Sequence, residues 1–300
     1  MTKVFGRVIT AMVTPFDYNG KVDISRAVEL AKRLADQGSD GVVLHGTTGE
    51  SPTVTSEEAL ELYRAVVKAV GDRMSVIAGC GSNSTDHAIH ETEKAEKAGV
   101  HAALIVVPYY NKPSQEGMKA HFRAVGSATK LPIMIYNIPG RTGVNMLPET
   151  AADLAKVPNI TSIKESSGDL NQIEKVRKIT PPEFLVYSGD DNLTLPIMKI
   201  GGHGVVSVAS HLVGLDLQLM VTSFLNGKME QAQKIHDTLM PLFNVLFITA
   251  NPTPVKAALE MIGFPVGGLR LPLLPANDNE KKQIRSVLEQ LSLLTPVGRP

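Results

Sequence analysis

Eight short runs of apolar, largely β-branched residues recur along the chain, and a longer stretch with helical spacing follows each of them. The runs are nearly continuous in apolar residues, which is typical of strands that are covered on both faces. Helical stretches between strands make parallel pairing the natural connection. Eight such units within about 225 residues predict an α/β fold of the (β/α)8 TIM barrel type. The expected strands are residues 8–13, 41–44, 75–78, 102–107, 133–137, 160–164, 184–188 and 204–208.

A doubly wound open sheet is the alternative architecture for the same alternation of strands and helices. Such a sheet more often carries a Gly-rich, dinucleotide-binding turn after its first strand. The residues that follow the first run here, Thr14-Pro15-Phe16, do not form such a turn. The barrel is therefore the preferred reading.

The last quarter of the chain has a different pattern. After Asn226-Gly227 the β-type runs disappear, and helical spacing continues with expected breaks at Pro241, at Asn251-Pro252 and at residues 271–275. We therefore expect two domains. Residues 1–226 would form the barrel that carries the active site, and residues 227–300 a small C-terminal all-α domain.

The overall charge and the cysteine content limit the classes of partner. The 300 residues include 30 basic and 30 acidic side chains, so the net charge is zero and gives no reason to expect nucleic acid or an anionic membrane as a partner. Cys80 is the single cysteine, which excludes an internal disulfide and a multi-cysteine metal site and fits a reducing compartment. The longest apolar runs have the length of strands rather than of membrane spans. We expect a cytoplasmic protein.

Lys164 ends the sixth run, where a polar loop begins. In a TIM barrel the active site is built at the carboxyl ends of the strands. Burial of an ammonium group is costly and favours the uncharged amine, which is a nucleophile toward carbonyl groups. The alternative is a strand-end lysine that extends into solvent, with Glu165 as a chance neighbour.

Other strand ends carry residues that suit the same chemistry. The second run is followed by Gly46-Thr47-Thr48-Gly49-Glu50-Ser51, the fourth by Tyr109 and Tyr110, and the fifth ends at Tyr136 and is followed by Arg141. Tyrosine and threonine hydroxyls can move protons while a lysine forms a Schiff base, and arginine binds carboxylates in a bidentate manner. Together these residues indicate carbonyl chemistry without a metal or a cofactor.

Five motifs carry a resemblance to the dihydrodipicolinate synthase family, which belongs to the pyruvate-dependent class I aldolases and lyases. They are GTTGES at 46–51, YNIPGRTG at 136–143, IKES at 163–166, SGDD at 188–191 and GGHGVVSV at 201–208. The resemblance implies a lyase that condenses pyruvate with L-aspartate 4-semialdehyde to 4-hydroxy-tetrahydrodipicolinate, the committed step of diaminopimelate and lysine biosynthesis. It also implies a homotetramer built as a dimer of dimers.

The resemblance implies four catalytic residues. Lys164 is similar to the Schiff-base lysine of the family, and Tyr136 to the proton donor and acceptor beside it. Thr48 resembles the hydroxyl that links Tyr136 to a second tyrosine, Tyr110, which in the family reaches into the active site of the partner subunit. The relay would then be complete only in the oligomer.

The resemblance implies a set of substrate-binding residues as well. Thr47 and Thr48 with Val206 would surround pyruvate, and Arg141 would face the carboxylate of the semialdehyde. Gly189 resembles the position where the family brings backbone close to the substrate. No metal ligand is implied, and His87 and His90 on one expected helix lack a third ligand.

Two other functions are compatible with parts of this pattern. Lyases of N-acetylneuraminate or of 2-keto-3-deoxy sugar acids resemble the chain in the lysine and the tyrosine but typically lack the arginine after YNIPG, so Arg141 favours a small acidic aldehyde. A non-catalytic, pyruvate-binding barrel is the other alternative. It would be favoured by the loss of Lys164, Tyr136 or Thr48, and all three are present.

Regulation by L-lysine is expected to be weak or absent. In inhibited members of the family, histidines often stand at the positions of Ser56 and Ala59, and a glutamate often stands at the position of His87. The glutamate binds the ammonium group of the effector, which an imidazole does poorly. Ser51, Asn83 and Tyr109 do match the inhibitor site of the family.

Overall fold

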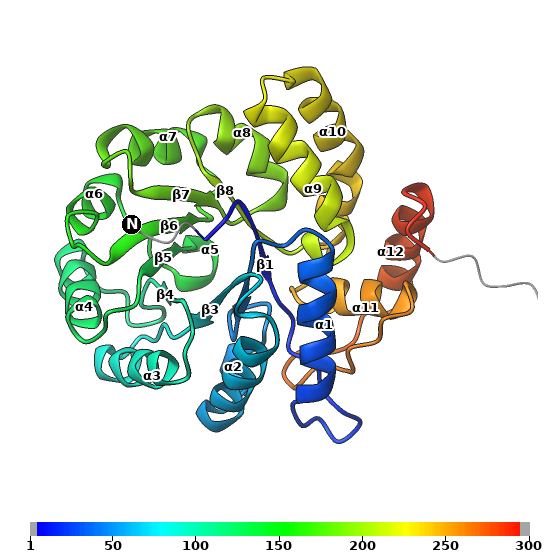
Figure 1. Cartoon of the computed structure of the whole chain (residues 1–300), viewed down its shortest axis with the longest axis horizontal. Helices are drawn as coiled ribbons and strands as arrows, with labels where there is room; N and C mark the ends of the chain where they lie inside the picture. Colours follow the sequence, from blue (N-terminus) through cyan, green and yellow to red (C-terminus); the bar gives the residue numbers. More distant parts are fainter. Residues whose placement is uncertain (1–4, 295–300) are drawn as a thin grey trace, which may run out of the picture.

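The computed structural model describes residues 5–294 and contains a closed barrel of eight parallel strands, paired in the order β1-β2-β3-β4-β5-β6-β7-β8 (Figure 1). The predicted TIM barrel is confirmed, and every observed strand overlaps its predicted run. The strands are β1 (Val8–Ala11), β2 (Gly41–Leu44), β3 (Ser75–Gly79), β4 (Ala102–Val106), β5 (Ile133–Asn137), β6 (Ile160–Glu165), β7 (Leu185–Ser188) and β8 (Gly204–Ser207).

Helices connect successive strands and form a ring outside the barrel (Figure 1). They are α1 (Ile24–Asp36), α2 (Ser56–Val70), α3 (Thr85–Lys97), α4 (Gln115–Ser127), α5 (Pro139–Thr142), α6 (Pro148–Leu154), α7 (Leu170–Ile179), α8 (Thr194–Lys199) and α9 (Ser210–Leu225). Short 3₁₀ helices, η1 (Ser51–Thr53) and η2 (Asp191–Leu193), follow β2 and β7. The C-terminal helices are α10 (Met229–Val245), α11 (Thr253–Met261) and α12 (Asp278–Gln290).

Side-chain caps set several of the helix starts. Asp23 accepts a hydrogen bond from the backbone N–H of Arg26 at the start of α1. At α12, Asn277 and Glu280 form a capping box, each accepting from the backbone N–H of the other. These bonds satisfy N–H groups that have no partner inside the helix. Asp23 and Asn277 therefore mark the starts of α1 and α12.

The acidic pair after β7, Asp190 and Asp191, does not cap the helical turn that follows it. Asp190 stands at the N-cap position of η2, but neither it nor Leu193 before α8 makes a side-chain cap bond. The carboxylate of Asp191 instead accepts from the backbone N–H groups of Val208 and Ala209, which follow β8. The carboxylate of Asp191 therefore binds the free N–H groups of the turn after β8 and not those at the start of its own helical turn.

Two apolar cores stabilise the barrel. The larger lies between the strands and the surrounding helices, and Cys80 packs within it, as predicted. The smaller fills the inside of the barrel and includes Ile9, Val43, Tyr136, Tyr187 and Val206. Successive residues of a strand point to opposite faces, so each strand contributes to both cores.

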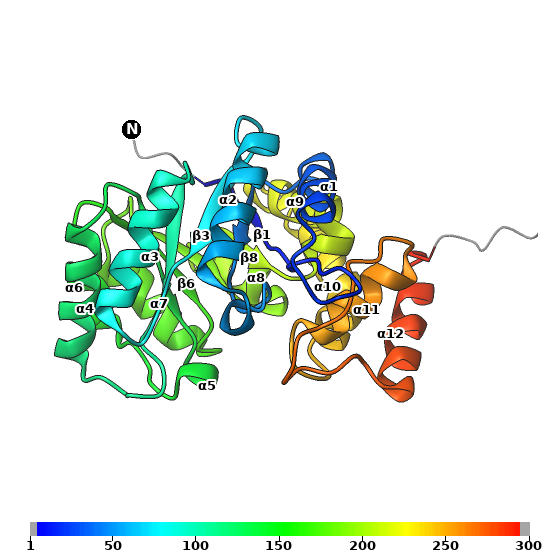
Figure 2. The same ribbon diagram turned by 90° about the horizontal axis from the view of Figure 1, so that it is seen from below.

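The C-terminal helices lie at one side of the barrel, next to α9 and α1 (Figures 1 and 2). The predicted helical character after residue 227 is confirmed, but the predicted break at Pro241 is wrong, because α10 continues through it. Proline removes one helical hydrogen bond. Burial of Leu239, Leu242 and Phe243 in the outer core compensates for that loss.

The predicted domain boundary falls in the turn between α9 and α10. The two helices pack against each other across this turn. The division into residues 1–226 and 227–300 stays a prediction, and residues 1–4 and 295–300 lie outside the described part of the chain. Over the described residues, every helix is too short or too polar to cross a bilayer.

Candidate active site

A cavity of about 570 Å³ opens at the carboxyl ends of β2 to β5. Among the residues that line it are Thr47, Tyr109, Tyr136 and Arg141, which follow or end three different strands. The rim of the barrel therefore brings together several of the residues that the sequence had singled out. This is the end at which active sites of TIM barrels are found.

Lys164 lies on β6 in register with Tyr136 on β5 and Tyr187 on β7. The residue is only 6% exposed, and its Nζ lies 4.1 Å from the centre of the Tyr136 ring. This is the distance of a cation–π contact when the amine is protonated. Lys164 is therefore a buried strand-end lysine rather than one that extends into solvent.

Two carboxyl groups from the end of β7 influence the charge around Lys164. Burial raises the pKa of both Asp190 and Asp191, and the positive charge of Lys164 acts in the opposite direction. Asp191 is fully engaged, because it accepts from the Ser207 hydroxyl at 2.5 Å in addition to its two backbone bonds. The lysine thus lies near acidic groups whose ionisation is itself opposed by burial.

Gly189 packs directly against Lys164. Its backbone N–H donates to the carbonyl oxygen of Glu165 at 2.8 Å. A Cβ atom at this position would lie 2.9 Å from Cε of Lys164 and would overlap the Ser166 hydroxyl. The backbone at Gly189 thus approaches the lysine closely, and the expected approach to the substrate stays a prediction.

The two threonines after β2 have different surroundings. Thr47 lines the cavity with Tyr136. Thr48 is buried, is absent from the cavity lining, and its hydroxyl accepts a hydrogen bond from the Asn251 side chain at 2.8 Å. Thr47 is therefore the threonine that shares the cavity with Tyr136, whereas the hydroxyl of Thr48 is bonded to Asn251.

Tyr110 does not join the cavity of its own chain. It is 87% exposed, and its backbone is left-handed with φ of +71°. Its N–H donates to the carbonyl oxygen of Thr142 at 3.3 Å. The neighbouring Tyr109 lines the cavity instead. A left-handed residue between two strand ends turns this side chain outward from the barrel.

The remaining predicted residues lie at different depths. Arg141 is exposed on the short helix α5 and lines the cavity mouth. Val206 is buried inside the barrel in the same apolar cluster as Tyr136. His45 also lines the cavity and lies within hydrogen-bonding distance of the Gly79 carbonyl oxygen and the Tyr63 hydroxyl.

A polar cluster behind β5 and β6 was not foreseen from the sequence. Glu165 is fully buried and accepts from the Asn137 side chain at 3.0 Å and from the Ser167 N–H at 2.9 Å. Burial raises the pKa of Glu165 to about 7. The alternation of side chains along a strand could have predicted this burial. If Lys164 points into the barrel, the next residue, Glu165, points outward into the helical layer.

The positions tied to L-lysine regulation also border this cavity. Ser51, Ser56, His87 and Tyr109 all line it.

Within residues 5–294, no group of three or more histidine, cysteine, aspartate or glutamate side chains is arranged to hold a metal ion.

Comparisons with known proteins agree over nearly the whole chain. The model of the dihydrodipicolinate synthetase family matches residues 4–291. The 4-hydroxy-tetrahydrodipicolinate synthase of Cyanothece sp. is 55% identical over 97% of this chain and 99% of that protein. The synthase of Heliobacterium modesticaldum is 56% identical over 96% of both chains.

Solved structures give the same result. A dihydrodipicolinate synthase of Cyanidioschyzon merolae, solved with lysine bound, is 51% identical and superposes with a TM-score of 0.95, covering 97% of this chain and 99% of that one. A monomeric dihydrodipicolinate synthase variant is 40% identical, with a TM-score of 0.95 over 97% and 98% of the two chains. Sequence motifs, barrel and strand-end geometry thus agree, and the chain belongs to the dihydrodipicolinate synthetase family.

Proposed function

We propose that this protein is a lyase that condenses pyruvate with L-aspartate 4-semialdehyde to 4-hydroxy-tetrahydrodipicolinate, the committed step of diaminopimelate and lysine biosynthesis. The observation that carries the proposal is Lys164, buried at the carboxyl end of β6 against Tyr136, which itself lines the cavity. Identity above 50% to synthases of that name supports the choice of reaction. We place the reaction in the cytoplasm.

The chemistry begins at the amine of Lys164. Its Nζ attacks the keto carbon of pyruvate, and the carbinolamine loses water to form an iminium ion. Loss of a proton from the methyl group gives an enamine, whose carbon attacks the aldehyde of the second substrate. The amino group of that substrate then displaces Lys164, which closes the ring and regenerates the enzyme. One water molecule leaves in the whole reaction.

Proton transfer in these steps is assigned to Tyr136. Its ring packs against Nζ of Lys164, so its hydroxyl is held near the reacting carbon. Thr47 replaces Thr48 as the proposed link of the relay, since it lines the cavity with Tyr136 while the hydroxyl of Thr48 is bonded to Asn251. A Thr47→Val variant should lose about 10²-fold or more in kcat, the usual contribution of a proton-transfer group.

Thr48→Val is the matched comparison. It should lower stability, because the Asn251 side chain loses its partner, and it should lower kcat less than Thr47→Val does, because it loosens the loop without removing the proposed proton-transfer group. A larger loss of kcat in Thr48→Val than in Thr47→Val would return the relay to Thr48, as the family resemblance first implied.

Substrate binding is assigned to groups around the cavity. The Thr47 hydroxyl and the side chain of Val206 would contact pyruvate, while the backbone of Gly189 keeps Lys164 in place. Arg141 would bind the carboxylate of the semialdehyde in a bidentate manner. Arg141→Lys should therefore raise KM for the semialdehyde about tenfold or more, with a much smaller change in KM for pyruvate.

Assembly is assigned to the exposed Tyr110. We infer a homotetramer built as a dimer of dimers, in which Tyr110 completes the relay in the partner subunit's site. Its exposure in the single chain supports this inference. Mixing Lys164→Ala with Tyr110→Phe subunits tests it. Hybrid dimers contain one intact site if Tyr110 acts across the interface, so activity should return on mixing. It should stay absent if Tyr110 serves its own subunit.

Trapping with borohydride tests the central step. Incubation with pyruvate and borohydride should add one reduced pyruvate to the intact chain, located at Lys164 by peptide mass spectrometry. Lys164→Ala should show no adduct, while Lys175→Ala, which removes a surface lysine of α7, should behave as the wild-type chain. No adduct on the wild-type chain would favour a non-catalytic, pyruvate-binding barrel.

The alternative lyases are separated by their substrates. A lyase of N-acetylneuraminate or of a 2-keto-3-deoxy sugar acid would also form the adduct at Lys164. It would release pyruvate from the sugar acid rather than consume it with the semialdehyde. Arg141 at the cavity mouth favours the short acidic acceptor.

A further inference from the structure

The C-terminal segment reaches the back of the loop that follows β2. We propose that Asn251, Lys256 and Arg270 are positioning residues of the active site, which hold residues 46–51 in the geometry that presents Thr47 to the cavity. The kinetic test of this role rests on the proposed function. The order of the loop can be measured without any activity.

Glu50 is the central contact of this arrangement. Its backbone is left-handed, with φ of +56°, and its side chain is directed away from solvent. Oε1 of Glu50 lies 2.7 Å from Nζ of Lys256, and the two side chains are only 2% and 3% exposed. Oε2 accepts from the backbone N–H of Arg270 at 3.0 Å. A carboxylate bound on both oxygens sets the direction of the loop.

Two further bonds anchor the two loop residues that precede Glu50. Thr48 accepts from the side chain of Asn251, 203 residues away in the chain. The carbonyl oxygen of Gly49 accepts from the Thr14 hydroxyl at 2.6 Å. Three consecutive loop residues that do not line the cavity are therefore fixed, and Thr47, which lines it, precedes them directly.

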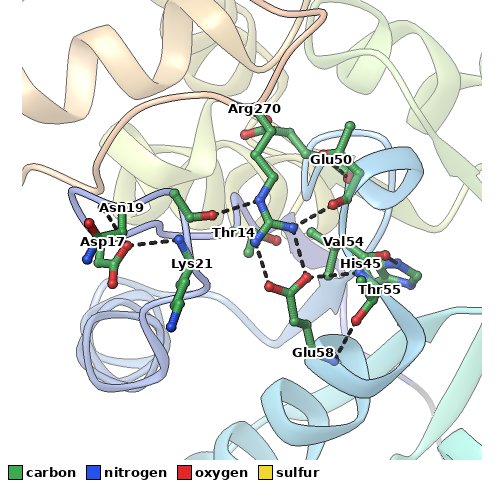
Figure 3. A network of polar contacts seen from close by, with 12 residues as sticks. Thr14, Asp17, Asn19, Lys21, His45, Glu50, Val54, Thr55, Glu58 and Arg270 are labelled. Carbon is green, nitrogen blue, oxygen red and sulfur yellow. Dashed lines mark hydrogen bonds and ion pairs between the residues drawn. The ribbon is translucent and has the colours of Figure 1, made fainter.

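Arg270 extends the arrangement to α2. Its guanidinium donates to both carboxylate oxygens of Glu58, at 2.5 and 2.8 Å, and to the carbonyl oxygen of Thr53 (Figure 3). The ring of Phe16 lies 4.2 Å from Nζ of Lys256 and 4.5 Å from the Arg270 guanidinium carbon. The loop is thus held between α2 and the segment that contains Arg270.

We expect the Glu50–Lys256 ion pair to add little net stability to the fold. Burial lowers the pKa of Lys256 to about 8, although the charge of Glu50 acts in the opposite direction. A lysine whose pKa is lowered by folding is protonated at a cost to the folded state, and this cost is full below about pH 8 and disappears as pH rises to 10.5. Buried ion pairs are often no more stable than apolar replacements. We therefore assign to the Glu50–Lys256 pair the role of fixing the position of the loop.

Separating position from stability requires a pair of variants. Lys256→Met leaves Glu50 buried without its cation, so it should lower both stability and activity. Adding Glu50→Gln removes the unpaired charge, and the double variant should regain the melting temperature. It should not regain activity, since the thioether that replaces the ammonium group cannot hold the loop. We expect kcat/KM about 10²-fold below wild type in both variants, the scale of an ångström misplacement.

The control variant is Leu288→Ala. Leu288 is buried on α12, in the same helical region, and its apolar side chain can make none of the hydrogen bonds and ion pairs that hold the loop. This variant should lower the melting temperature while leaving kcat/KM within about twofold below its transition. Activity that follows the melting temperature across all of these variants, and so returns in the double variant, would overturn the proposal.

Hydrogen exchange of the peptide that contains residues 46–51 gives a readout that needs no activity. Exchange should rise in Lys256→Met and in the double variant, and it should be unchanged in Leu288→Ala. Unchanged exchange in the first two would refute the positioning role. A wild-type chain that makes no product while its loop responds in this way would refute the proposed function and leave the loop anchoring established.

Discussion

Gly189→Ala is a one-carbon change that should act on Lys164. The added Cβ would lie 2.9 Å from Cε of the lysine and 3.2 Å from the carbonyl oxygen of Glu165, and it would overlap the Ser166 hydroxyl. The serine can rotate away, because its hydroxyl has no hydrogen-bond partner in the structure. The backbone carbonyl cannot move as easily, so the lysine side chain must give way.

The size of the effect follows from that distance. Two carbon atoms in contact are about 3.5–4.0 Å apart, so Cε must move by about 0.6–1 Å. A misplacement of about 1 Å at the reacting group can cost about 10²-fold in rate. Since each factor of ten corresponds to about 1.4 kcal/mol, the barrier should rise by about 3 kcal/mol.

Steady-state kinetics of the condensation, together with the rate of borohydride-trapped adduct formation, measure this effect. Both should fall about 10²-fold in Gly189→Ala. Gly140→Ala is the matched control, because an added Cβ there meets nothing within 4 Å. A second variant, Gly189→Ala with Ser166→Ala, should stay impaired, since removal of the hydroxyl does not relieve the contact with the lysine.

Two results would refute the reasoning. A Gly189→Ala variant with wild-type adduct formation would show that Lys164 adapts without loss. Full recovery on adding Ser166→Ala would show that the serine, and not the lysine, transmits the change.

Further predictions concern pH, regulation and stability. Burial raises the pKa of Glu165 from 4.5 to about 7, so ionisation of this carboxyl group lowers the stability of the wild-type protein as pH rises between these values. The melting temperature of Glu165→Gln, measured relative to wild type, should therefore increase from about pH 5 to about pH 8. A constant difference would contradict this prediction. L-lysine should inhibit weakly or not at all, because His87 lines the cavity at the position where a glutamate would be needed to bind the ammonium group of the effector. Half-inhibition below about 1 mM L-lysine would be the contrary result. Asp191→Ala should lower the free energy of unfolding, measured by chemical denaturation, by about 3 kcal/mol or more. The reason is that the buried N–H groups of Val208 and Ala209 lose their acceptor. A loss below about 1 kcal/mol would argue against this prediction.

The barrel could be predicted from the sequence because its signals are local. Apolar runs of four to six residues separated by helical stretches define strands and parallel connections without knowledge of the contacts. The position of Lys164 at a strand end then places it at the catalytic rim, since strand ends of a barrel share one face. The predicted break at Pro241 was wrong for the opposite reason, because apolar packing between distant helices outweighed a local signal.

The choice between Thr47 and Thr48 could not be made in the same way. Both are hydroxyl residues in one loop, and the loop is irregular, so no periodicity tells which side chain faces the cavity. Asn251 decides it from 203 residues away by binding Thr48. Glu50 is a similar case, as its partners Lys256 and Arg270 come from a segment with its own local pattern.

The sequence by itself thus determined the alternation of strands and helices, the strand that carries the lysine and the family to which the chain belongs. Only the tertiary structure decided that Thr47 shares a cavity with Tyr136, that Tyr110 is exposed, and that the C-terminal segment contacts the loop after β2. The physical reason is one of range. Strands and helices follow from contacts between near neighbours, whereas the direction of a loop side chain depends on partners that only the folded chain brings within hydrogen-bonding distance.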